Sequence, residues 1–160
     1  MRSRGHAALN CTKLLDEAMD TQYRFSGNTA EIDRERVHRW ISEQTYWAPG
    51  RSRARQDAAI DGSRNFGVYD SASNRQVAYA RMVTNGVTFA WLCDAFVDPD
   101  VRGHGIGAML IAGIVENCRP LGLRRIALST SDAHGLYAKF DFTPLATSES
   151  WMERLDQPNS

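Results

Sequence analysis

Apolar residues recur along the chain in two patterns, one typical of strands and the other of helices. Short alternating or compact apolar runs, bounded by polar and glycine-rich turns, predict strands. The expected strands are residues 23–26, 65–70, 76–84, about 87–97, 123–130, 142–145 and 150–155. Apolar residues at three- and four-residue spacing predict helices that begin after Asp33, near Gly105 and after Ser131 or Asp132.

The order of these elements predicts a mixed α/β fold. Asn85-Gly86 is a strong hairpin signal, so the strand after it is expected to pair antiparallel with the strand before it. Residues 21–158 are expected to form one domain, and residues 1–20 an N-terminal extension with one short helical turn. We therefore expect a mixed, mostly antiparallel sheet with helices on its faces.

Composition narrows the classes of partner. Lys plus Arg and Asp plus Glu are both 19, so the formal net charge is zero. Such a balance argues against broad electrostatic attraction to nucleic acid or to an anionic membrane. The three cysteines have no metal-ligand spacing, and we expect no metal site. No apolar run approaches the length of a membrane span, so a cytoplasmic location is expected.

A glycine-rich stretch at residues 97–107 joins an expected strand to an expected helix. Three glycines alternate with other residues here, at Gly103, Gly105 and Gly107. They leave the backbone without side chains that would hinder a ligand, and the first N–H groups of a helix have no internal partners. With Arg102 beside them, these groups favour a phosphate or pyrophosphate. The alternative is a helix start in which the glycines only permit a tight turn.

A dinucleotide fingerprint is a second interpretation of the same stretch. Residues 103–108 match G-x-G-x-x-A, but in that motif the glycines follow the strand directly, with an acidic residue about 20 positions on. Here residues 98–102 intervene, and the residues near that offset are Leu123, Arg124 and Arg125. The spacing disfavours this alternative.

Two motifs together resemble the GCN5-related N-acetyltransferase (GNAT) family. The first is Arg102-Gly103-His104-Gly105-Ile106-Gly107, preceded by Val97 and Pro99. The second is the run from Asp132 to Phe142, which resembles the family's tyrosine-bearing helix before a strand. The two occur in the family's order and separation, and the resemblance covers roughly residues 23–155.

The resemblance implies a fold, a cosubstrate and a reaction. It implies a seven-stranded sheet whose fourth and fifth strands splay apart, and direct transfer of an acetyl group from acetyl-CoA to an amine. It implies that residues 102–107 bind the cofactor and that a backbone N–H near Phe96 or Val97 supports the oxyanion. It also implies that Tyr137 protonates the departing thiolate.

Other residues are candidates from their own chemistry. A carboxylate within an apolar strand is costly without partners, so Asp94 is either part of the network that deprotonates the amine or a structural carboxylate held by backbone or Arg donors. Tyr46 and Trp47 either line an acceptor pocket or cover the core. Asp141 replaces the glycine usual in the family at the helix exit, where a left-handed backbone is expected.

Two other functions remain open at this point. The domain could bind acyl-CoA without catalysis, as a sensor, or act as an interaction module through Tyr46, Trp47 and the N-terminal extension. The expected partners of an enzyme are acetyl-CoA and an amine acceptor, with a homodimer as a candidate assembly. The sequence does not name the acceptor.

Overall fold

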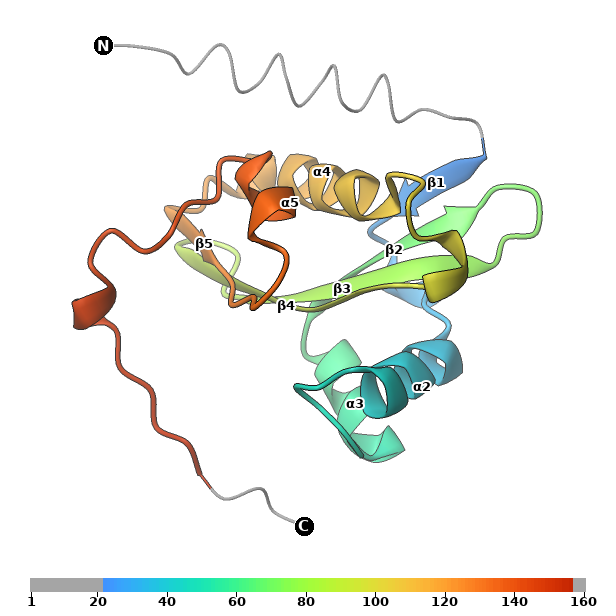
Figure 1. The fold of residues 1–160 in the computed structure, drawn as a ribbon, viewed down its shortest axis with the longest axis horizontal. Helices are drawn as coiled ribbons and strands as arrows, with labels where there is room; N and C mark the ends of the chain where they lie inside the picture. Colours follow the sequence, from blue (N-terminus) through green and yellow to red (C-terminus); the bar gives the residue numbers. More distant parts are fainter. Residues whose placement is uncertain (1–21, 157–160) are drawn as a thin grey trace.

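Five strands form one sheet in the computed structural model, which describes residues 22–156 (Figure 1). The expected N-terminal extension and the last residues of the expected domain lie outside this range. The strands and helices are β1 (Tyr23–Ser26), η1 (Thr29–Glu31), α2 (Arg34–Gln44), α3 (Arg53–Asp61), β2 (Arg64–Asp70), β3 (Gln76–Thr84), β4 (Phe89–Val97), η2 (Pro99–Val101), α4 (Ile106–Cys118), η3 (Arg119–Leu121), β5 (Arg125–Ala127), α5 (His134–Ala138) and η4 (Ser148–Ser150).

The sheet is antiparallel up to β4 and parallel at its last pair, so the mixed sheet expected from the sequence is confirmed. The strand order is β1-β2-β3-β4-β5. β5 pairs only with the first three residues of β4, and the ladder ends at Trp91 and Ala127. Among the described residues, the rest of β4 therefore has no strand neighbour on that side, and the splay between the fourth and fifth strands is confirmed.

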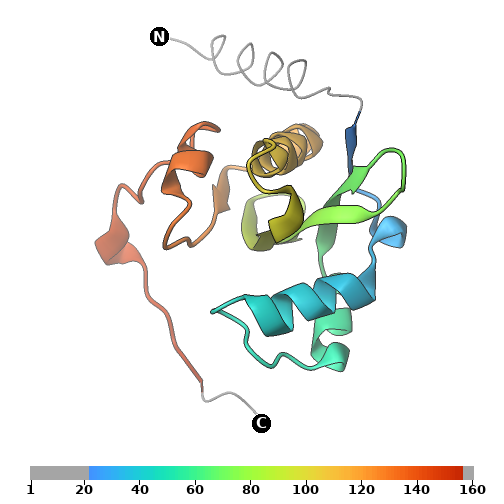
Figure 2. The same ribbon diagram turned by 45° about the vertical axis from the view of Figure 1, so that its right-hand side comes forward.

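Helices cover both faces of the sheet and make two separate cores. α4 and α5 lie on one side and α2 and α3 on the other, as the two views agree (Figures 1 and 2). Leu92 and Met82 pack with Leu110 on the α4 side. On the other side, Trp40 of α2 packs on Phe96 of β4, with ring centroids 5.4 Å apart. Each core thus ties one helical layer to the strand that leads to the glycine-rich stretch.

A β-bulge in β4 changes which face its side chains occupy. Arg81 pairs with Cys93 and Tyr79 pairs with Phe96, so the single residue between them on β3 faces two residues on β4. The first of these two is Asp94, whose φ is 53°. Left-handed backbone is costly for most residues but is tolerated by Asp. Because of this extra residue, Leu92 and Phe96 lie on opposite faces although they are four positions apart.

The expectation of seven strands is wrong, because the last two strands do not form within the described residues. Pro144 lies in residues 142–145 and has no N–H to donate to a ladder. Further on, Ser150 N donates to Thr147 O at 3.0 Å in the 3₁₀ turn η4, so this backbone bonds locally. The strand at 123–130, which its apolar run predicts as a central strand, is also shorter and lies at the edge of the sheet.

Element boundaries differ from expectation in three further places. α3, capped by Ser52, was not expected. The strand after the hairpin begins at Phe89, because the Asn85 side chain accepts from the N–H groups of the next residues and lengthens the turn. Neither Ser131 nor Asp132 caps α5; Thr130 Oγ1 accepts from Ala133 N instead.

Two local expectations are confirmed. Asp33 caps α2, and its carboxylate accepts from Arg36 N at 3.0 Å. Asp141 has a φ of 64°, in the left-handed region expected at the helix exit.

Candidate active site

The loop between β4 and α4 is held rigidly at its start and leaves an open backbone at its end. Asp98, which is buried, accepts from Asp100 N at 3.1 Å and from Arg75 Nη2 at 2.7 Å. Farther along, Gly103 and Gly105 have φ values of 86° and 74°. A Cβ built on either would meet no described atom within 4 Å. The backbone here is therefore positioned by the loop and open to a ligand.

The first turn of α4 has no side-chain cap. Gly105 occupies the N-cap position and offers no acceptor to the N–H groups that follow. Such N–H groups, together with the helix dipole, make a site for an anion. A phosphate or pyrophosphate is thus the kind of ligand that this end of α4 suits.

Arg102 and His104 are both tied to the local backbone. Arg102 Nε donates to Val97 O at 3.2 Å, and its guanidinium carbon lies 5.5 Å from the centre of the Phe96 ring. The two terminal nitrogens of Arg102 have no hydrogen bond to a described residue, so they are available to an anion. His104 Nδ1 lies 3.0 Å from Val101 O, and its side chain does not line the adjoining groove.

A groove of about 600 Å³ runs beside the splayed end of β4. It joins the glycine-rich loop, the end of β4, the loop after α2 and one side of α5. Its lining residues are Gln44, Tyr46, Trp47, Ala95, Phe96, Val97, Arg102, Gly103, Gly105, Ile106, Gly107, Ala108, Asp132, Leu136 and Lys139. Except for His104, the structure thus places every expected cofactor-binding residue on one wall, with the expected acceptor residues Tyr46 and Trp47 beside them.

Neither backbone conformation nor packing requires a glycine at position 107. Its φ is not in the left-handed region, and a Cβ built there would lie 3.4 Å from Leu136 Cδ2. Both are compatible with a Cβ, because 3.4 Å is an ordinary van der Waals distance.

Tyr137 lies on the other side of α5. It lines a second hollow of about 600 Å³ along β5, while Leu136 and Lys139 face the first groove. Its ring is 8% exposed and packs edge-on against Phe142 at 5.7 Å. Burial, and next the charge of Asp132, raise the pKa of Tyr137 above its ordinary value of 10.0. The Tyr137 hydroxyl therefore carries a proton at neutral pH. Tyr137 belongs to α5, which contributes residues to both hollows.

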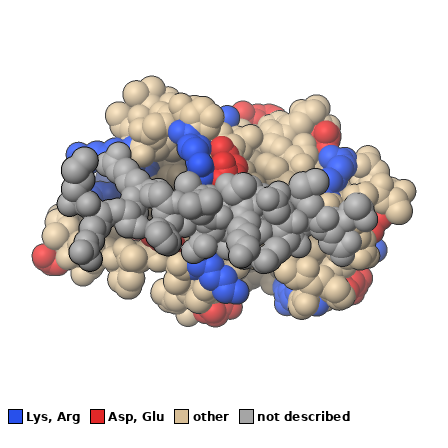
Figure 3. Space-filling view, turned by 90° about the horizontal axis from the view of Figure 1, so that it is seen from above, with Lys and Arg blue, Asp and Glu red and all other residues tan. Residues whose placement is uncertain are grey.

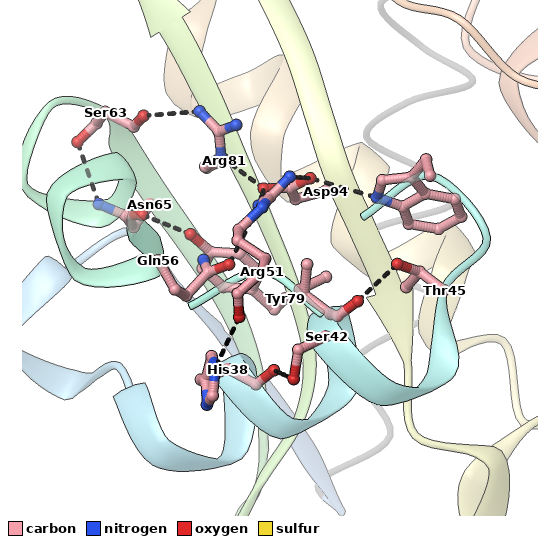
Figure 4. Close-up of polar contacts among 12 residues, drawn as sticks. His38, Ser42, Thr45, Arg51, Gln56, Ser63, Asn65, Tyr79, Arg81 and Asp94 are labelled. Atoms are coloured by element: carbon pink, nitrogen blue, oxygen red, sulfur yellow. Dashed lines mark hydrogen bonds and ion pairs between the residues drawn. The ribbon is translucent and has the colours of Figure 1, made fainter. Parts of the chain in front are cut away.

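Asp94 is surrounded by donors (Figure 4). Its carboxylate receives Arg51 Nη1 and Arg81 Nε, each at 2.6 Å, and the indole Nε1 of Trp47 at 3.2 Å. Burial opposes the charged form, but the hydrogen bonds from the two arginines outweigh it and hold the pKa of Asp94 below 3.8. These are the contacts of a structural carboxylate, the second of the two alternatives for this residue.

Tyr46 and Trp47 stand at the mouth of the groove. Their rings are 67% and 44% exposed and meet edge-on at 5.0 Å, so neither simply covers the core. The loop after α2 carries Tyr46, whose hydroxyl lies 2.6 Å from Ser131 Oγ. This contact links that loop to the residue just before Asp132.

Sequence reasoning missed three residues of this region. Arg51, Arg53 and Arg55 alternate with other residues in the sequence, and their spacing does not show which of them reaches Asp94. Ser131 and Asp132 were considered only as helix caps. The role of each of these residues depends on which loops meet beside the splayed strands, and a local sequence pattern does not predict such contacts.

Charges of both signs are interspersed on the visible part of the face above α4 and α5 (Figure 3). Within residues 22–156, no group of three or more His, Cys, Asp or Glu side chains is placed to hold a metal ion. The helices in the same range are all too short or too polar to cross a bilayer.

Comparisons with known proteins agree on a family. The model of the acetyltransferase (GNAT) family matches residues 34–142. A solved structure from Xanthomonas campestris pv. campestris, provisionally described as a GNAT-family acetyltransferase, is 40% identical, with a TM-score of 0.78 over 84% of this chain and 93% of that chain.

Two other proteins resemble the chain less closely. Serotonin N-acetyltransferase 2, chloroplastic, of Oryza sativa subsp. japonica is 35% identical over 83 residues, which are 50% of this chain and only 42% of that enzyme. A Mycobacterium tuberculosis protein solved in complex with CoA has a TM-score of 0.62 at 16% identity, over 76% of this chain and 72% of that chain, and so shares the fold. The family match and the 40% identical structure establish that the chain belongs to the GNAT family of acetyltransferases.

Proposed function

We propose that the protein transfers an acetyl group from acetyl-CoA directly to an amine. The observation that carries this proposal is the uncapped first turn of α4, opened by Gly103 and Gly105 beside Arg102 and facing a groove along the splayed strand β4. This backbone suits a pyrophosphate, and the groove leads from it toward two exposed aromatic rings. The name of the rice relative, an N-acetyltransferase, supports an amine as the acceptor.

The residues of the groove have different proposed roles. The N–H groups of Gly105 and the residues that follow would hold the pyrophosphate, with Arg102 adding a formal charge. Past Trp91, the backbone of β4 has no partner strand on its β5 side, so an N–H near Phe96 or Val97 is our candidate donor to the oxyanion. The amine must lose a proton before it attacks, and we assign that proton to solvent.

For Tyr137 we propose the role of acid toward the departing thiolate. Its raised pKa keeps the proton in place at neutral pH, which a donor requires. For Asp94 we propose a positioning role. Its carboxylate is paired with two arginines and accepts a hydrogen bond from Trp47, and Trp47 lines the groove.

A calorimetric titration with acetyl-CoA and a thiol-release assay over an amine panel test the proposal together. We expect saturable binding and thiol release with at least one amine. Binding without release over a broad panel would favour a non-catalytic acyl-CoA sensor, and no binding at all would favour an interaction module. A cytoplasmic location and a homodimer stay predictions.

A further inference from the structure

Asp132 is the acidic residue that lines the groove. The other polar and charged lining residues are Arg102, Lys139, Gln44 and Tyr46, together with the indole of Trp47. Within residues 22–156, the Asp132 carboxylate has no hydrogen bond or ion pair, and the residue is exposed. An unpaired carboxylate in a groove is available to a cationic ligand.

The aromatic pair adjoins this carboxylate. The Tyr46 hydroxyl lies 2.6 Å from Ser131 Oγ, and Ser131 immediately precedes Asp132. Trp47 meets Tyr46 edge-on at 5.0 Å and is fixed by its own bond to Asp94. The faces of Tyr and Trp rings attract cations, most of all beside a carboxylate.

Asp132 lines the same groove as Phe96 and Val97, where the oxyanion donor is expected. Its charge is the second cause, after burial, of the raised pKa of Tyr137. Asp94, in contrast, has its carboxylate filled by Arg51 and Arg81 and does not line the groove. Asp132 is therefore better placed than Asp94 to meet an acceptor.

We propose that the acceptor is a cationic amine whose ammonium group binds between the Asp132 carboxylate and the rings of Tyr46 and Trp47. This inference rests on the proposed function and names the substrate class of the same groove. Asp132 acts in recognition: it holds the charged form, and the amine loses its proton to solvent before attack.

A binding experiment with CoA-saturated protein tests this without turnover. The probes are phenethylammonium and 2-phenylethanol, which share a ring and differ in charge. Binding is followed by the NMR signal of the Trp47 indole N–H, assigned through Trp47→Phe. In the wild type we expect the ammonium to bind roughly three- to tenfold more tightly than the alcohol, the range of one partly exposed ion pair with a cation–π contact.

Asp132→Asn should bring the two dissociation constants to within about twofold. Glu43→Gln is the matched control, because Glu43 is also exposed, has no ion pair in residues 22–156 and lies one residue from the groove without lining it. It should keep the wild-type preference. Equal binding of both probes to the wild type, or an unchanged preference in Asp132→Asn, would overturn the proposal.

Two further readouts separate this inference from the proposed function. CoA affinity should be the same in the wild type, Asp132→Asn and Glu43→Gln; loss of CoA binding in the wild type itself would refute the proposed function. With an amine that is turned over, Asp132→Asn should raise KM about three- to tenfold and move the rise of kcat with pH to lower pH, since the ammonium is no longer stabilised. A fall in kcat at unchanged KM would instead make Asp132 a base and refute a role in recognition alone.

Discussion

Asp94 and Arg81 join two neighbouring strands through one short ion pair, with 2.6 Å between the carboxylate and Arg81 Nε. The Asp94 side chain is 3% exposed and that of Arg81 15%. Arg51 reaches the same oxygen from the loop after α2, also at 2.6 Å. One carboxylate at a β-bulge therefore ties the sheet to the loop that carries Tyr46 and Trp47.

Removal of this charge should be costly. In Asp94→Asn two poorly exposed guanidinium groups lose their counter-charge, so we expect the free energy of unfolding to fall by about 3 kcal/mol at neutral pH. Denaturant unfolding measures this. Asp61→Asn is the control, because Asp61 also pairs with an arginine at 2.6 Å but is 65% exposed; its cost should be below about 1 kcal/mol. Equal costs would contradict the structural role.

The pH dependence of stability follows from the lowered pKa of Asp94. Near and below pH 3.8 the unfolded state binds more protons than the folded state, so stability falls as pH drops through the folded-state pKa and is fully present well above 3.8. The difference in unfolding free energy between wild type and Asp94→Asn should thus shrink on the acid side. A difference independent of pH would refute this assignment.

Turnover separates the two roles considered for Asp94. If it only positions Trp47, Asp94→Asn should raise KM for the amine and leave the pH midpoint of kcat unchanged. If it is the base, turnover should instead fall most at low pH. Trp47→Phe, which keeps a ring but loses the bond to Asp94, should reproduce the KM effect.

Gly105→Ala should weaken acetyl-CoA binding at least tenfold, because its new Cβ would stand where the pyrophosphate approaches. Gly86→Ala is a closely matched control. The two glycines have φ values of 74° and 75°, and a Cβ on either meets no described atom within 4 Å, but Gly86 lies in the β3–β4 turn. Both variants should lose about 1 kcal/mol of stability, and calorimetry should find weakened binding only for Gly105→Ala.

Tyr137→Phe keeps the ring and its packing on Phe142 and removes the hydroxyl. We expect the fold and acetyl-CoA affinity to be retained and the chemical step to slow by about 10²–10⁴. Single-turnover kinetics measures that step directly. A wild-type single-turnover rate would mean that Tyr137 serves only in packing.

Asp141→Gly should stabilise the protein. Asp141 has a left-handed backbone, and its side chain makes no hydrogen bond to a described residue. Relief of the steric cost gives roughly 1 kcal/mol, partly offset by chain entropy, or a rise in Tm of about 2–4 °C. Asp141→Asn, which also tolerates this backbone, should change Tm less. A clear fall in Tm for Asp141→Gly would point to a stabilising contact of the carboxylate.

Local patterns in the sequence predicted most of the sheet and the glycine-rich start of α4. Asp33 as a cap, the helix after Gly105 and the left-handed Asp141 all depend on neighbours within a few positions. The two missing C-terminal strands show the limit of such patterns, because a strand forms only where a partner edge is present.

The acceptor side of the groove was harder to predict, because its contacts join residues that are far apart in the sequence. Asp94 could be recognised as an expensive carboxylate, but its partners come from positions 13 and 43 residues away. Tyr46 meets Ser131 at a separation of 85 residues. Such contacts follow from the splay of β4 and β5, which is a property of the whole sheet.

The bulge at Asp94 also sets how the chain tolerates changes in length. Deletion of Asp94 would restore an unbroken ladder in which Phe96 still pairs with Tyr79, because Leu92 and Phe96 would then be three positions apart and regular alternation would keep them on opposite faces. The glycine-rich loop leaves β4 directly afterwards and would start from the same face as before. Deletion of Asp94 should therefore remove its ion pairs with Arg51 and Arg81 but leave the glycine-rich loop in place. The β3–β4 turn, at the far end of the same strand, can likewise gain or lose residues without moving this loop.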